Sequence, residues 1–332
     1  MTTTDSPQSS APAAQNASIA ALRTALSTVI VGQEKLLDRL LIGLLCGGHV
    51  LVEGLPGLAK TTAIKTLAAG IHARFRRVQF TPDLLPGDLT GTDIYDPRES
   101  RFHFVEGPLF NEIILADEIN RAPAKVQSAL LEAMQEKQIT VGGETRALPP
   151  LFMVMATQNP LEQAGTYPLP EAQLDRFLLH VMLDYPAADE ELEILRRDRR
   201  MHLSDGRAHL APVLDVAAVL AARETVNAVH IAESVEQWIV ALVRASRTPG
   251  EWKPEWSKAV EVGASPRAAL AMAHAAAALA YLRGRDFVTP DDVREVAPDC
   301  LRHRIVLSLD ARLKKLTPNG IVAGLLDAIP AP

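Results

Sequence analysis

Two glycines, a lysine and two threonines stand close together in one short segment of the chain. The glycines let the backbone turn tightly and aim its N–H groups at phosphate oxygens. Lys60 can reach the β- and γ-phosphates of a nucleotide, and Thr61 can offer its hydroxyl to Mg²⁺. The segment predicts a phosphate-binding loop, with a plain glycine-rich turn as the alternative. Its residues are Gly54, Leu55, Pro56, Gly57, Leu58, Ala59, Lys60, Thr61 and Thr62.

The flanks of this loop supply the context that the motif needs. Residues 49–53 read as a short buried strand and residues 61–69 as a helix, so the order is strand, turn, helix. The free N–H groups and the dipole at the start of the helix favour an anion there. Ala59 stands where the general pattern has glycine. Because its methyl group is small and tolerates a first helical turn, we expect phosphate binding to be retained.

Two adjacent acids end a second apolar strand, predicted over residues 112–118. A strand this apolar is typical of a parallel sheet with both faces covered. Ligands of open α/β sheets bind at the carboxyl ends of such strands. Asp117 can hold Mg²⁺ directly or through water, and Glu118 can act as the general base for an attacking water. The alternative is a pair of solvated acids at a strand end.

A third apolar strand, over residues 151–159, ends in polar residues. Asn159 at its end could orient the attacking water or contact the γ-phosphate. Its alternative role is that of a turn residue before Pro160.

Two arginines complete the set of candidate catalytic residues. Arg176 follows a short predicted helix and could reach the nucleotide of a neighbouring subunit, where it would neutralise charge on the transferring phosphoryl group. A surface pairing with Asp175 or Glu171 is the alternative. Arg267 lies in the first turn of a helix that begins after Ser265. It could sense the γ-phosphate in its own subunit from a separate domain, or be an ordinary helix-start arginine.

These pieces, in this order and spacing, resemble an AAA+ ATPase, and the residues around them are similar to the MoxR family. The similarity is carried by residues 79–91, 116–134, 156–160 and 263–267, and it extends over about residues 20 to 310. The resemblance implies an α/β fold, with a P-loop AAA+ core whose parallel sheet is flanked by helices and a smaller all-α lid. In the family that it resembles, alanine is also usual at the position of Ala59 in the phosphate loop.

The resemblance also implies an activity and partners. The activity would be Mg²⁺-dependent ATP hydrolysis, with ATP and Mg²⁺ as the cofactors. The assembly would be a homo-oligomeric, hexameric ring. The work would be chaperone-like: remodelling, maturation, or cofactor or metal insertion in a partner complex, together with a von Willebrand factor A domain protein. The family also places the turn of Val31, Gly32 and Gln33 against the adenine. Nothing in the sequence identifies the client.

Composition and simple sequence features bear on the number of domains and on the location of the protein. The chain has 332 residues, 48% of them hydrophobic, which favours two globular domains. The predicted division is a disordered tail over residues 1–18, the nucleotide-binding core over 19–186 and the lid over 187–332. The most apolar stretch, residues 268–282, is too short to span a membrane. The tail lacks the basic residues of a signal peptide. With Cys46 and Cys300 expected to be reduced thiols, these features predict a cytoplasmic protein.

Two rival classes of function stay open. A nucleic-acid motor is disfavoured by the net charge of -6. A non-hydrolysing switch or scaffold would have no need of Glu118. Two predicted hairpins, within residues 92–105 and 139–146, either finish the edge of the sheet or face a channel or partner. The segment 248–262, which carries Trp252 and Trp256, has no predicted function.

Overall fold

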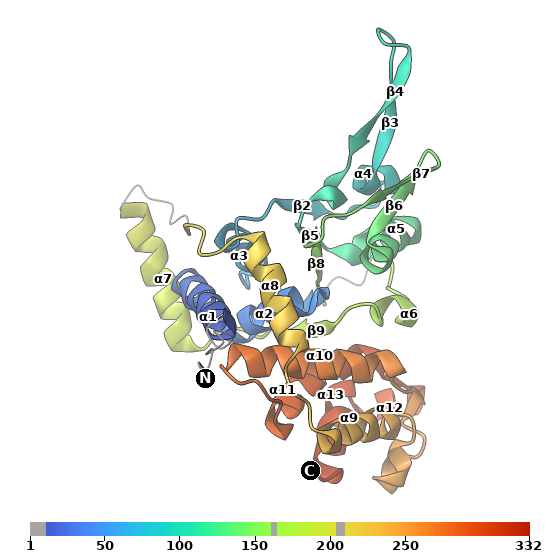
Figure 1. Cartoon of the computed structure of the whole chain (residues 1–332). Coiled ribbons are helices and arrows are strands. Elements are labelled where there is room, and N and C mark those ends of the chain that lie inside the picture. Colours follow the sequence, from blue (N-terminus) through green and yellow to red (C-terminus); the bar gives the residue numbers. More distant parts are fainter. Residues whose placement is uncertain (1–10, 161–164, 204–209) are drawn as a thin grey trace, which may run out of the picture.

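The structure is a computed structural model that describes residues 11–160, 165–203 and 210–332, without the side chains of residues 11–15 and 201–203. Its centre is a five-stranded parallel sheet with the order β2-β5-β8-β1-β9 (Figure 1). The predicted α/β class is therefore confirmed. The strands are β1 (Val50–Glu53), β2 (Phe75–Gln79), β5 (Ile113–Asp117), β8 (Met153–Gln158) and β9 (Leu179–Met182).

Helices cover both faces of this sheet, which explains why its central strands are apolar along their whole length. Successive residues of a strand point to opposite faces. Val50 and Val52 thus pack in one core cluster, with α1 (Ala11–Val29), α2 (Glu34–Cys46) and α3 (Lys60–Gly70). Leu51 packs in the other cluster, with α4 (Pro86–Thr90) and α5 (Ala124–Glu136).

The strand register brings the predicted functional residues to one edge of the sheet. Ala116 of β5 pairs with Ala156 of β8, and Glu53 of β1 pairs with Gln158 of β8. The carboxyl ends of these three strands therefore lie side by side. The phosphate loop leaves β1 at this edge, and the two acids end β5 there.

Both predicted hairpins are present. One consists of β3 (Gly91–Asp96) and β4 (Arg101–Glu106), and the other of β6 (Gln138–Val141) and β7 (Glu144–Ala147). In Figure 1 the β3–β4 hairpin extends away from the sheet, and the β6–β7 hairpin lies beside its base. The two are close because Gly142 faces Asp93: a Cβ at Gly142 would lie 2.3 Å from that carboxylate.

The C-terminal part is helical, as expected. It consists of α7 (Ala188–Leu203), α8 (Val216–Asn227), α9 (Glu233–Ala245), α10 (Pro266–Leu282), α11 (Pro290–Leu301), α12 (Leu309–Leu313) and α13 (Pro318–Ala328). One small exception was not predicted: β10 (Val260–Val262) pairs with β11 (Val306–Leu307). These strands are too short to show an alternating pattern in the sequence.

The predicted N-terminal tail needs a correction. Residues 1–10 lie outside the described part of the chain, but α1 begins at Ala11, within the tail predicted over residues 1–18. Alanine has the highest helix propensity, and a proline such as Pro12 is compatible with a first helical turn. Ala13 and Ala14 after Pro12 therefore favour a helix in the segment that we expected to be disordered.

A buried ion pair joins the sheet domain to the C-terminal helices. Arg39 of α2 is 2% exposed and donates to Asp299 of α11 at 2.7 Å and to Glu295 at 3.1 Å. Burial alone would lower the pKa of Arg39, but the two carboxylates raise it. Helix α10 also packs directly on α2. The division at residues 186 and 187 stays a prediction.

The tryptophan segment has a packing role at one of its two rings. Trp256 is buried against Gly324 of α13, where a Cβ would lie 2.2 Å from the indole ring. Lys253 lies over the same ring, with its ammonium 4.6 Å from the centroid. Trp252, by contrast, is 40% exposed. Trp256 thus anchors the segment to the last helix of the chain.

The two cysteines are free thiols, Cys46 half-buried and Cys300 buried. Burial raises the pKa of Cys300 to about 12, which keeps the thiol protonated. Across the described residues, none of the helices combines the length and the apolar character needed to cross a bilayer.

Candidate nucleotide site

One cavity of about 390 Å³ lies at the carboxyl edge of the sheet, and its volume is in the range of small-molecule sites. It gathers residues from the phosphate loop, β2, β5 and β8. The described residues that line it are Pro56, Gly57, Leu58, Ala59, Lys60, Thr61, Thr62, Arg77, Asp117, Glu118, Thr157 and Asn159. The structure therefore brings together most of the predicted phosphate-loop residues and three of the predicted polar ones.

The phosphate loop has the backbone that its glycines allow. Gly57 has φ +88°, which L-residues rarely adopt, and a Cβ there would meet no atom within 4 Å. Lys60 begins α3 and donates to the carbonyl of Gly54 at 2.5 Å. Burial lowers the pKa of Lys60, while Asp117 and Glu118 act in the opposite direction. The ammonium is thus held at the loop, next to the acids.

The position of Ala59 differs from our expectation. It does not lie in the first helical turn but precedes the helix as its N-cap, with φ 54° and ψ 17°. This left-handed conformation costs an L-residue about 1–2 kcal/mol, a cost that glycine avoids. Ala59 therefore carries backbone strain beside Lys60.

A buried threonine holds the two acids in place. Thr157 of β8 is 1% exposed and donates its hydroxyl to Asp117 Oδ1 at 2.6 Å. The same hydroxyl oxygen accepts the backbone N–H of Glu118 at 2.9 Å. Thr157 thus fixes both the carboxylate of Asp117 and the start of the turn that follows it.

Glu118 is a strained residue. Its φ of 57° and ψ of 51° are left-handed, and such outliers often occur at functional sites. Its Oε2 accepts the amide of Gln79 at 2.6 Å and lies 3.2 Å from Arg121 Nε. The carboxylate is therefore oriented by side chains on two separate elements.

Asn159 follows β8 and is 8% exposed, at the same edge as the acids. The structure places it where the sequence predicted, in the lining of the cavity. Whether it orients water stays a prediction.

The sequence did not assign a role to three residues at this site. Thr157 was visible as a hydroxyl inside an apolar strand, two residues before Asn159, and that position was the available signal. Arg77 on β2 lies outside every motif, and Gln79 begins the segment 79–91 that carries the resemblance but was given no role. They reach the site because β2 pairs with β5, with Gln79 opposite Asp117.

The donor set suits a magnesium ion. Thr61 supplies a hydroxyl oxygen and Asp117 a carboxylate oxygen to the same cavity. Mg²⁺ prefers such oxygen ligands and is usually bound by one or two protein groups together with substrate phosphates. The residues present therefore fit the metal that the sequence predicted.

The two candidate arginines lie together, away from the phosphate loop. Arg176 and Arg267 line a second cavity of about 220 Å³, with Met134, Gln135 and Asp175. Arg267 Nη1 lies 3.9 Å from Asp175, whose oxygens also accept from Ser265 at 2.9 Å and from Arg304 at 2.6 Å.

The predicted role of Arg267 at the γ-phosphate of its own subunit therefore stays a prediction. Its side chain is not among the described residues that line the phosphate-loop cavity. The contacts of Ser265 and Arg304 with Asp175 fix this part of the C-terminal helices beside Arg176. The two arginines consequently form one surface.

The predicted adenine turn lies beside the start of α7. A Cβ at Gly32, which has φ +70°, would lie 2.9 Å from Glu190 and 3.1 Å from Pro186. The amide of Gln33 donates to the carbonyl of Asp184 at 3.4 Å. Val31, Gly32 and Gln33 are outside the described lining of the phosphate-loop cavity, and so their role stays a prediction.

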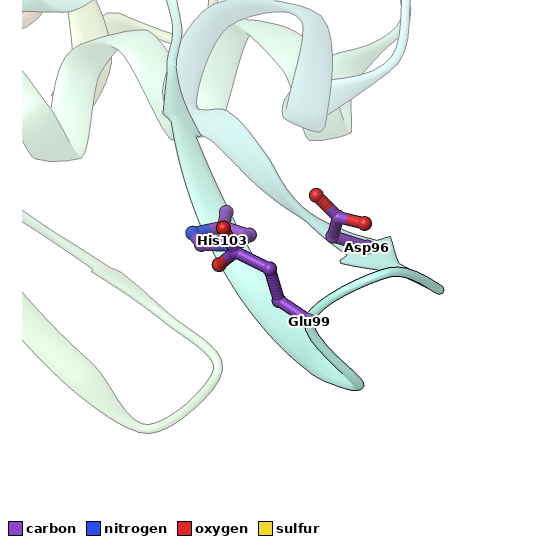
Figure 2. Close-up of side chains that lie close together, drawn as sticks. All are labelled: Asp96, Glu99 and His103. Atoms are coloured by element: carbon purple, nitrogen blue, oxygen red, sulfur yellow. The ribbon is translucent and has the colours of Figure 1, made fainter.

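A separate group of possible metal ligands occupies the tip of the β3–β4 hairpin (Figure 2). Ligand atoms of Asp96, Glu99 and His103 lie within 4.8 Å of one another. However, Arg101 Nε donates to Glu99 at 2.5 Å and to His103 at 3.2 Å. Glu99 and His103 thus already bind the guanidinium cation of Arg101. This exposed cluster therefore gives no support to a metal site.

A parallel sheet with a phosphate loop after β1, paired acids at the end of β5 and a helical C-terminal region defines an AAA+ ATPase. The AAA family described as "ATPase family associated with various cellular activities" matches residues 49–179, and the AAA lid domain family matches residues 256–322.

Similar proteins identify the family within the AAA+ ATPases to which the chain belongs. "Chaperone MoxR1" of Mycobacterium tuberculosis is 46% identical over 305 residues, which cover 92% of this chain and 80% of that protein. "Protein MoxR" of Paracoccus denitrificans is 31% identical and covers 93% of this chain and 94% of its own length. A crystal structure of a proposed ATPase from Cytophaga hutchinsonii has a TM-score of 0.90 and 44% identity, covering 97% of both chains. The chain belongs to the MoxR family of AAA+ ATPases.

The contacts of Thr157 lead to a test. Replacing Thr157 with valine keeps the shape of the side chain but removes the hydroxyl, so that the part-buried N–H of Glu118 loses its acceptor. A buried donor left unpaired costs about 1–3 kcal/mol. When this cost adds to the activation free energy of the reaction, the rate of ATP hydrolysis should drop about ten- to a hundredfold.

Steady-state ATPase assays at saturating nucleotide would measure this effect. Thr157→Ser retains the hydroxyl and serves as the control, with activity near that of the wild type. A valine variant that folds and hydrolyses ATP at the wild-type rate would show that Thr157 does not position the acids.

Proposed function

We propose that the protein hydrolyses ATP with Mg²⁺ and couples that reaction to chaperone-like remodelling of a partner protein complex. The observation that supports it is the cavity in which Lys60, Asp117, Glu118 and Asn159 converge. Four polar groups of the types that phosphoryl transfer needs thus surround one space of nucleotide-phosphate size.

In this proposal each residue has one task. The loop N–H groups and Lys60 bind the phosphates, and Thr61 and Asp117 hold Mg²⁺, which when bound neutralises charge on the β- and γ-phosphates. Glu118 accepts a proton from the attacking water as general base. Its fixed orientation, imposed by Gln79 and the left-handed backbone, favours one direction of approach.

Two substitutions should abolish hydrolysis for different reasons. Lys60→Ala removes a phosphate ligand and should weaken ATP binding. Glu118→Gln keeps the loop and the side-chain volume but cannot take the proton, so it should bind ATP and stall. Binding of a fluorescent ATP analogue and phosphate release would be measured on the same samples. Hydrolysis by Glu118→Gln at the wild-type rate would exclude Glu118 as the base.

We also propose that the protein acts as a homo-oligomeric, hexameric ring. The second cavity supports this, because Arg176 and Arg267 lie together at a site distinct from the phosphate loop of their own chain. Two cations at such a surface can neutralise the phosphoryl group bound by a neighbouring subunit. Both arginines would then act across the interface.

Mixing of inactive variants tests this arrangement. In a mixed ring, an Arg176→Ala subunit supplies an intact phosphate loop and a Lys60→Ala subunit supplies the missing arginine, so some activity should return. Arg267→Ala mixed with Lys60→Ala should also be rescued if Arg267 acts across the interface.

The mixture of Arg267→Ala with Lys60→Ala distinguishes the two possible roles of Arg267. If Arg267 acts within its own subunit, no interface in that mixture is complete and activity stays absent. Each mixture must first be shown to exchange subunits, for example by energy transfer between labelled chains. Absence of rescue with Arg176→Ala in an exchanging mixture contradicts the proposed role of Arg176.

The proposed work on partner proteins rests on the β3–β4 hairpin and on the relatives. The hairpin exposes large apolar side chains, a property of protein-interaction sites. They are Ile94 (52% exposed), Tyr95 (50%), Phe102 (68%) and Val105 (49%). A relative is named a chaperone. We therefore propose contact with a von Willebrand factor A domain partner and its client, in the cytoplasm. The net charge of -6 disfavours nucleic acid.

Capture with a stalled variant tests this part of the proposal. Glu118→Gln with ATP should retain a protein that contains a von Willebrand factor A domain, because the ATP-bound state persists. Adding Phe102→Ser to that variant should release the partner while ATP binding is unchanged. Retention of nucleic acid instead of such a protein would favour the motor alternative.

A further inference from the structure

Arg77 forms an ion pair with the residue proposed to hold Mg²⁺. Its Nε and Nη2 donate to Asp117 Oδ2 at 3.0 and 2.7 Å. The other carboxylate oxygen, Oδ1, accepts the hydroxyl of Thr157. Both oxygens of Asp117 are therefore engaged, and the guanidinium lies in the lining of the nucleotide cavity.

A second side chain of β2 supports this position of Arg77. Arg77 and Gln79 are two residues apart on the strand and so lie on the same face. Gln79 Oε1 accepts from Arg77 Nη2 at 2.9 Å, and its amide nitrogen donates to Glu118 at 2.6 Å. Because arginine can only donate and a carboxylate can only accept, the orientation of the Gln79 amide is fixed. Consecutive hydrogen bonds thus connect Asp117 to Glu118 through Arg77 and Gln79.

A magnesium ion and this guanidinium require the same acceptor. A cation at Asp117 would replace the two N–H donors on Oδ2, and like charges a few ångströms apart repel each other. Arg77 has room to leave, since its side chain is 51% exposed whereas that of Asp117 is 13% exposed. Because water screens the exposed guanidinium, the ion pair is weak enough for the exchange to occur readily.

We propose that Arg77 is a positioning residue that competes with Mg²⁺ for Asp117 and so sets the concentration of Mg²⁺ at which nucleotide binds tightly. Gln79 strengthens that competition by holding the guanidinium on Asp117. The inference rests on the proposed function, in that Asp117 is taken as a metal-holding residue.

Removal of Arg77 should therefore lower the Mg²⁺ requirement. Binding of a fluorescent ATP analogue would be titrated with free Mg²⁺ in the wild type, in Arg77→Met and in Gln79→Leu. The half-saturating Mg²⁺ should fall about two- to fivefold in Arg77→Met, as expected for the loss of one such ion pair. Gln79→Leu should shift it in the same direction by less.

Arg76→Met is the matched control. It removes the same charge from the adjacent position of β2, which points to the opposite face, and should leave the half-saturating Mg²⁺ unchanged. Thermal unfolding would show that each variant is folded.

Two outcomes would overturn the proposal. In one, the half-saturating Mg²⁺ of Arg77→Met is unchanged or raised while nucleotide still binds. In the other, Arg77→Met loses nucleotide binding with and without Mg²⁺, which would make Arg77 a phosphate ligand. Neither result affects the ATPase proposal, whose own test is the hydrolysis by Lys60→Ala and Glu118→Gln.

Discussion

Parallel pairing of β1, β5 and β8 is the constraint on which the whole site depends. The three strands run in the same direction, so their carboxyl ends meet at one edge. The phosphate loop, the acid pair and Asn159 each follow one of these ends and converge there. Burial of the strands on both faces fixes their register, because a slip by one residue would exchange the two core faces.

Two residues of the site at that edge have a strained backbone. Ala59 and Glu118 both have left-handed backbones that cost an L-residue free energy. Strain of this kind persists only where the surroundings determine the conformation. At Glu118 they do so through the hydroxyl of Thr157 and the amide of Gln79. The packed sheet thus stabilises a local conformation that would be unfavourable by itself.

Asp175 has a comparable role for the arginine surface. It lies between the sheet domain and the C-terminal helices and accepts hydrogen bonds from Ser265 and Arg304. These contacts place Arg267 beside Arg176. Together with the buried pair of Arg39 and Asp299, they tie the C-terminal helices to the nucleotide domain. Polar contacts at two separate places therefore fix the helical region to the nucleotide domain.

The sequence by itself determined the α/β class, the two hairpins and the phosphate loop, because hydrophobic periodicity and short motifs indicate these elements locally. It could not place Arg77 and Gln79 at the acids, since that depends on the pairing of β2 with β5. It also could not show the contact of Arg267 with Asp175, which joins residues far apart in the chain. Local propensity and motif spacing specify elements and their ends, whereas contacts between elements depend on how the folded core packs them.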